Sequence, residues 1–109
     1  MSYPSFKAAK QALGNRDGQQ IHHLTEQCQV KPQRSGFSVE RINTTDNLVW
    51  LPEPVHRRVS GRYSRTVFGT DKILRDYLNG RDWDYQYDRG IREVNRAMEE
   101  QERHDSGRD

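Results

Sequence analysis

The sequence contains little of what several protein classes require. Only one of its 109 residues, Cys28, is a cysteine, which excludes an intramolecular disulfide and a zinc module built from several cysteines. No apolar run approaches the roughly 18 residues of a membrane-spanning helix. No signal-peptide pattern is present either. We therefore expect a chain that needs no disulfide and does not span a membrane.

Apolar residues are also scarce. They make up 31% of the chain, and the mean hydropathy is −1.17. Charged residues are another 31%, but the two signs nearly cancel to a net charge of +2. Disordered chains combine low hydrophobicity with a high net charge, which is absent here. We expect one folded domain over residues 1–109 with a thin core, whose stability is modest or depends on a bound metal or partner.

Apolar periodicity predicts a helix, two strands and a second helix in the first 63 residues. Residues 5–13 are rich in alanine and have apolar side chains at helical spacing. Residues 20–28 alternate like a strand, and the apolar run 48–51 is typical of a buried strand. These strands can pair as an antiparallel ribbon over residues 21–27 and 47–51. Residues 37–43 predict a helical turn capped by Ser38 or a strand, and a helix begins near Pro54 or Val55.

The C-terminal part, residues 70–103, is predicted to be helical. Residues 71–78 form one helix, capped by Thr70 or Asp71, and residues 82–102 form a longer one. In the longer helix five apolar side chains fall on one stripe, which we expect to face the core. The polar tail, residues 104–109, is expected to be frayed. The stripe consists of Trp83, Tyr87, Ile91, Val94 and Met98.

Three of the four histidines lie where this fold can bring them together. His22 and His23 are adjacent in the first strand, and His56 opens the helix after the second strand. Strand pairing would carry His56 back over the doublet. Neighbouring residues of a strand point to opposite faces, so a site that uses both His22 and His23 requires the strand to end, twist or bulge there. The alternative is one buried, hydrogen-bonded histidine and one surface histidine.

Imidazoles beside arginines suit the hydrolysis of a phosphodiester. Histidine titrates near neutrality and can take a proton from water. A divalent metal polarises the phosphate, and arginine holds phosphate oxygens in a bidentate fork. Arginines gather in residues 56–65, which contain no acid, although such runs are also common on solvated helix faces. These features predict a metal-dependent phosphodiesterase site, and the pI of about 8.9 permits a nucleic-acid partner.

The order of these motifs resembles the HNH or His-Me finger (ββα-metal) nuclease superfamily. The shared pattern is His-His, then the segment NLVWLP, then His56 followed by a basic helix and Tyr63. It covers residues 20–63 and is most similar to the His-His nuclease domains of polymorphic bacterial toxins, including Rhs and type VI secretion effectors. The resemblance implies an α+β fold with a small ββα-metal core, a two-stranded antiparallel ribbon plus a helix, surrounded by additional helices.

The resemblance also implies roles for individual residues. His22 and His56 become metal ligands, and His23 becomes the general base. Asn47 becomes the asparagine that constrains the loop holding the base, with Asn43 as the alternative. Three arginines of the helix are expected to contact phosphates: Arg57, Arg58 and Arg62.

The implied function is that of a metal-dependent DNase toxin. The implied cofactor is a divalent metal, Mg²⁺ or else Mn²⁺, Zn²⁺ or Ni²⁺. Few protein ligands are expected around it, because Ser60 stands where some members of the superfamily have another histidine. Such a domain belongs to a carrier effector, is secreted by a dedicated system and acts in the cytoplasm of a target cell. A cognate immunity protein neutralises it. The alternatives are an RNase toxin and a non-catalytic module that binds nucleic acid or protein.

Overall fold

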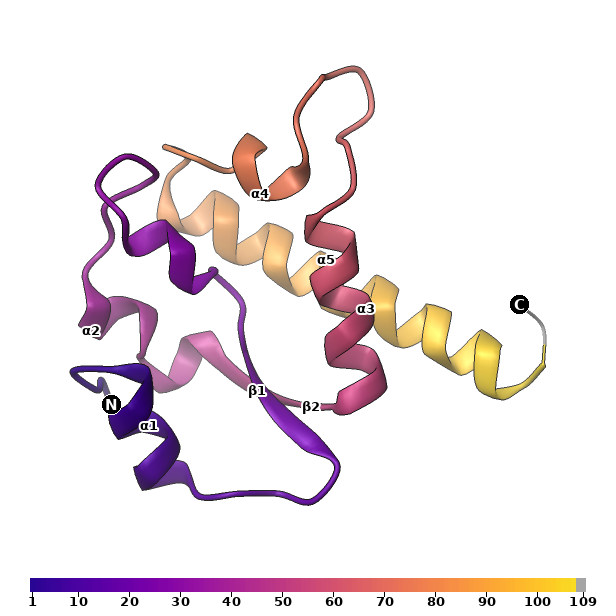
Figure 1. Ribbon diagram of the computed structural model, residues 1–109, viewed down its shortest axis with the longest axis horizontal. Helices are drawn as coiled ribbons and strands as arrows, with labels where there is room; N and C mark the ends of the chain where they lie inside the picture. Colours follow the sequence, from indigo (N-terminus) through magenta and orange to yellow (C-terminus); the bar gives the residue numbers. More distant parts are fainter. Residues whose placement is uncertain (108–109) are drawn as a thin grey trace.

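The structure, a computed structural model, describes residues 1–107 and has an α+β fold in which helices surround a two-stranded ribbon (Figure 1). The strands β1 (Gln19–His23) and β2 (Leu48–Pro52) pair antiparallel, with His22 opposite Val49 and His23 opposite Leu48. The predicted mixed fold with an antiparallel ribbon is therefore confirmed. No helix within the described residues is long and apolar enough to span a bilayer.

Short helices flank the ribbon. Helix α1 (Phe6–Leu13) begins after Ser5, whose hydroxyl accepts a hydrogen bond from the Ala8 amide, and it ends at Gly14. Gly14 has φ +76°, a left-handed conformation that favours glycine. Ser38 caps the short helix α2 in the connection between the strands, so the helical alternative for that segment is confirmed. The connection contains η1 (Gln27–Val30), α2 (Val39–Ile42) and η2 (Thr45–Asn47).

The core lies where α3 (Glu53–Tyr63) packs across the long helix α5 (Trp83–Asp105), as Figure 1 shows. Val59 and Ala97 are fully buried at this crossing. Helix α5 also approaches the chain just after β1. A Cβ atom on Gly90 would lie 2.1 Å from the carbonyl oxygen of Leu24. Helix α5 thus lies directly against the segment that follows the histidine doublet.

Two predicted boundaries are wrong. The first strand ends at His23 instead of continuing to residue 28, because the amides of Leu24 and Thr25 donate to Asn47 and no longer to a facing strand. Of the helix predicted over residues 71–78 only α4 (Leu74–Tyr77) forms. Neither Thr70 nor Asp71 caps it, because α4 begins after Ile73 and has no side-chain cap. The Thr70 hydroxyl instead donates to the carbonyl of Val67 within the preceding loop.

The stripe predicted to face the core is wrong in part. Ile91 is 38% exposed and Met98 is 49% exposed, whereas α5 buries Gly90 and Glu93. Burial of Glu93 is tolerated because its carboxylate pairs with arginines of α3 and α5. Helix α5 extends to Asp105, into the tail expected to be frayed, and residues 108 and 109 of that tail lie outside the described residues.

Candidate functional site

The three histidines line one cavity of about 510 Å³ that extends along β1. His22 faces α3, where the centroid of its ring lies 5.7 Å from that of His56 and 6.4 Å from that of Tyr63. His23 faces α1, where its ring meets the ring of Phe6 edge-on with the centroids 4.6 Å apart. Alternation along β1 therefore sends the doublet to two sides. Both residues still line one cavity, because that cavity extends along the whole of β1, from Gln19 to His23.

His22 has the properties of a cation ligand. Its side chain is 7% exposed, and Nε2 is buried without a hydrogen-bond partner among the described residues. Burial, followed by the charges of His56 and His23, lowers the pKa of His22 to about 3. Burial also lowers the pKa of His56. Both rings are therefore neutral at neutral pH, the form that binds metal ions, and a shared cation would satisfy the orphaned nitrogen.

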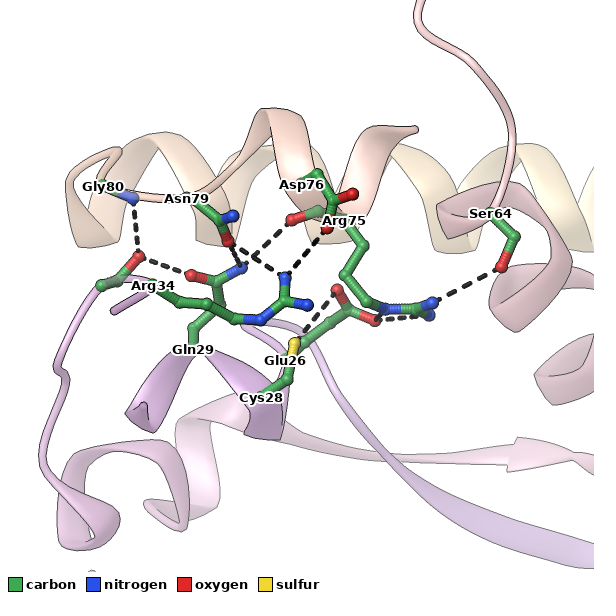
Figure 2. A network of polar contacts seen from close by, with 10 residues as sticks. Glu26, Cys28, Gln29, Arg34, Ser64, Arg75, Asp76, Asn79 and Gly80 are labelled. Carbon is green, nitrogen blue, oxygen red and sulfur yellow. Dashed lines mark hydrogen bonds and ion pairs between the residues drawn. The ribbon is translucent and has the colours of Figure 1, made fainter. Parts of the chain in front are cut away.

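The donor set around this pair is small. Within residues 1–107, no group of three or more His, Cys, Asp and Glu side chains is placed to hold one metal ion. Glu26 also lines the cavity, but its Oε2 lies 2.9 Å from Nε and Nη2 of Arg75 (Figure 2). His22 and His56 could hold a divalent metal only as a pair, which would leave further positions to water and phosphate oxygens.

His23 is held in one tautomer by Asn43. Nε2 of His23 lies 2.9 Å from Oδ1 of Asn43, whose Nδ2 donates to the carbonyl of Val39 at 3.0 Å. Because the Asn43 oxygen can only accept, Nε2 of His23 donates, and Nδ1 retains the lone pair. Burial lowers the pKa of His23, against the opposing effect of the bond to Asn43. At neutral pH the ring is therefore an oriented, unprotonated base.

Asn47 acts on the chain beside the histidines. Its buried side chain accepts from the Thr25 amide at 2.7 Å and donates to the carbonyls of Thr25 and Ile42 at 3.0 and 2.9 Å. Its own carbonyl accepts from the Leu24 amide at 2.9 Å. These bonds fix the two residues that follow His23. Asn47 therefore constrains the backbone, whereas Asn43 contacts the ring directly.

Two of the three arginines expected to contact phosphate are engaged with α5. Nε of Arg62 lies 2.5 Å from Oε2 of Glu93, and its guanidinium also pairs with Glu100. Nε of Arg58 donates to Oε1 of Gln101 at 2.7 Å. Arg58 and Arg62 thus take part in the contact between α3 and α5, and their contact with phosphate stays a prediction. Arg57 is exposed beside His56 and stays a predicted phosphate contact.

The sequence did not indicate the cavity residues that lie outside residues 20–63. Phe6 and Lys10 of α1 and Arg75 of α4 line the cavity. Arg75 is positioned by Glu26, and its carbonyl accepts from the buried side chain of Gln29 at 3.3 Å (Figure 2). Phe6 gave only a helical-spacing signal, which indicated core packing. No sequence pattern pointed to Lys10 or Arg75.

The buried His22 predicts a loss of stability in acid. Its pKa is about 3 in the folded protein, against an ordinary value of 6.5. As the pH falls below 6.5, the unfolded chain binds a proton that the folded protein does not. From this residue alone, the free energy of unfolding should fall by about 1.4 kcal/mol per pH unit, or about 2 kcal/mol between pH 8 and pH 5.

Urea unfolding in the presence of EDTA measures this effect. His22→Gln should flatten the pH dependence by that amount. Equal pH dependence in the wild type and His22→Gln would show that the folded protein does not hold this imidazole neutral.

Comparisons of the chain with models of protein families, with curated proteins and with solved structures found no match. The function is therefore inferred from the residues of the cavity and from the motif order in residues 20–63.

Proposed function

We propose that this protein is a metal-dependent endonuclease that hydrolyses phosphodiester bonds of DNA. The observation that carries the proposal is the convergence of His22, His23 and His56 on one cavity. Their environments differ. His22 and His56 form a neutral pair with one unpartnered nitrogen, whereas His23 is a separate base oriented by Asn43. The order β1, β2, α3 also agrees with a ββα-metal core.

In the proposed reaction, Nδ1 of His23 takes a proton from the attacking water while Nε2 remains bonded to Asn43. His22 and His56 would hold the divalent metal, Mg²⁺ or else Mn²⁺, Zn²⁺ or Ni²⁺. When bound, the metal supplies positive charge that polarises the phosphate and stabilises the leaving oxygen. Arg57 binds a neighbouring phosphate. Contacts to phosphates read no bases, so we expect little sequence specificity.

The electrostatics favour this reaction over a metal-free RNase. A metal-free mechanism with two histidines needs one of them protonated as the general acid. The pKa of His22, lowered by burial to about 3, keeps that ring unprotonated near neutrality. Burial also lowers the pKa of His56. The cavity therefore offers bases and ligands at neutral pH, and a metal fits this set better than an imidazolium acid does.

The biological setting is proposed from the motif resemblance of residues 20–63. It is that of an antibacterial effector domain, delivered by a dedicated secretion system within a carrier protein and acting in the cytoplasm of the target cell. A cognate immunity protein would neutralise it. An acidic inhibitor covering Arg57 and the cavity mouth would exclude DNA by electrostatic complementarity. Such an inhibitor should compete with DNA, and simultaneous binding of both would contradict occlusion of the site.

Removal of the metal should abolish the activity. The wild-type protein is expected to nick and linearise supercoiled plasmid in Mg²⁺. Cleavage should stop in excess EDTA and resume when Mg²⁺ is restored. Agarose gels of timed samples measure this, with Mn²⁺, Zn²⁺ and Ni²⁺ and a structured RNA tested in parallel. Cleavage of RNA in excess EDTA would instead support the RNase. Retarded migration of DNA without cleavage in every metal would support a non-catalytic module.

A further inference from the structure

Phe68 holds its ring in solvent on a loop beside the site. The residue is 102% exposed, and it is the most exposed large hydrophobic residue within residues 1–107. It lies in the connection between α3 and α4, which projects from the body of the molecule (Figure 1). An aromatic ring whose whole face is accessible on an ordered loop can stack on another planar group, such as a nucleic-acid base.

The loop is ordered by its own hydrogen bonds. Thr66 and Ile73 form an antiparallel bridge, and the Val67 amide donates to the carbonyl of Lys72 at 2.8 Å. The amide and hydroxyl of Thr70 both donate to the carbonyl of Val67, at 3.0 and 2.9 Å. Val67 itself packs against the core. The chain therefore turns inward on one side of Phe68 and presents the Phe68 ring outward in a preformed geometry.

The base of this loop reaches the wall of the cavity. The Leu74 amide donates to the carbonyl of Arg65 at 2.9 Å, which closes the loop. Nη1 of Arg75 lies 3.4 Å from the Ser64 hydroxyl (Figure 2), and Arg75 lines the cavity. Phe68 follows Ser64 by four positions, which limits the distance between the two Cα atoms to about 13 Å. A nucleic-acid strand that leaves the cavity past Arg75 and Ser64 would thus pass within reach of the Phe68 ring.

The surroundings of Phe68 favour nucleic acid over protein as the ligand. The core of a protein interface groups several apolar side chains, but the neighbours of Phe68 at the tip, Gly69 and Thr70, offer none. Two exposed cations flank the loop, Arg65 and Lys72, against one acid within it, Asp71. Nη2 of Arg65 lies 3.8 Å from Oε2 of Glu100, and the Arg65 side chain remains 61% exposed. An isolated aromatic ring between cations is the arrangement that stacks on bases while the cations hold the backbone.

We propose that Phe68 stacks on an unpaired base of the substrate, so that the enzyme prefers single-stranded or locally unpaired nucleic acid. This inference rests on the proposed function and names the form of the substrate. A base within a duplex is covered by its neighbours, whereas an unpaired base offers a free face to the ring. Arg65 and Lys72 are placed to contact the phosphates on either side of that base.

Binding of a fluorescein-labelled single-stranded oligonucleotide, measured by anisotropy in the His23→Gln background, tests this inference. Phe68→Ala should weaken binding by about five- to one-hundred-fold. Phe68→Leu should weaken it nearly as much because leucine lacks a π face, and Phe68→Tyr should preserve it. Met98→Ala, which removes another exposed apolar side chain, is the matched control and should bind as the parent does. The thermal midpoint should not change, because the ring makes no buried contact.

Two results would overturn the inference, and they differ in what they say of the nuclease. If the wild type cleaves nucleic acid but Phe68→Ala binds and cleaves as the wild type does, the stacking role is wrong and the proposed function stands. The same holds if Phe68→Ala loses only the binding of a protein. If the wild type neither binds nor cleaves DNA or RNA in any metal, both proposals fail.

Discussion

Replacing His23 with glutamine is expected to lower the rate of plasmid cleavage by about 10²- to 10⁴-fold, the usual contribution of a general base. Glutamine has a similar length, and its amide can still donate to Oδ1 of Asn43. In the wild type this oxygen lies 2.9 Å from Nε2 of His23. Glutamine has no basic nitrogen, so the attacking water keeps its proton. The loss should appear in kcat, because His23 is assigned to the chemical step and not to the binding of phosphate.

The control for this variant is His104→Gln, which changes an exposed histidine near the end of α5 and should cleave at the wild-type rate. Circular dichroism and the thermal midpoint should show that His23→Gln remains folded. If the folded variant cleaves plasmid as fast as the wild type, His23 is not the base, and the proposed division of roles within the doublet is wrong.

The features of the fold that could be predicted are those set by local sequence. Ser5 and Gly14 delimit α1, and Asp82 caps α5 through a hydrogen bond from the Tyr85 amide. The buried face of α5 was harder to predict, because helical periodicity assigns large apolar residues to the core. The structure instead buries Gly90 and Ala97, whose small size lets α5 approach its neighbours. Such close approach is a property of the partner surface, which the helix sequence does not contain.

The candidate site shows the same difference between features set by local sequence and contacts between distant segments. The motif order placed His22, His23 and His56 within reach of one another, because strand pairing and a following helix limit where the chain can go. The order could not decide between Asn43 and Asn47, since both lie in the same connection. Only the folded chain separates them: Asn43 contacts the His23 ring, and Asn47 contacts the backbone after it. The sequence also did not indicate that Arg62 pairs with Glu93 of α5, which lies 31 residues further along the chain.

The position of His23, the proposed base, depends on α5 as well as on the ribbon. Leu24 follows His23 directly, and its carbonyl accepts a hydrogen bond from the Tyr63 hydroxyl at 3.3 Å. The same carbonyl faces Gly90, where any side chain would collide with it. Backbone atoms cannot rotate aside as a flexible side chain can, so relief requires α5 or the end of β1 to move. Gly90 therefore links the packing of α5 to the placement of His23.

Gly90→Ala is consequently expected to lower the free energy of unfolding by about 2–3 kcal/mol, the upper part of the range for overpacking, and to slow cleavage by displacing His23. The matched control is Gly61→Ala in α3, where an added Cβ atom meets nothing within 4 Å. Alanine is the better helix former, so this control should gain about 0.5–1 kcal/mol. Urea unfolding and plasmid cleavage measure both variants. Equal gains in stability at the two positions would mean that α5 does not lie against Leu24, and that the contact which helps to place the base is absent.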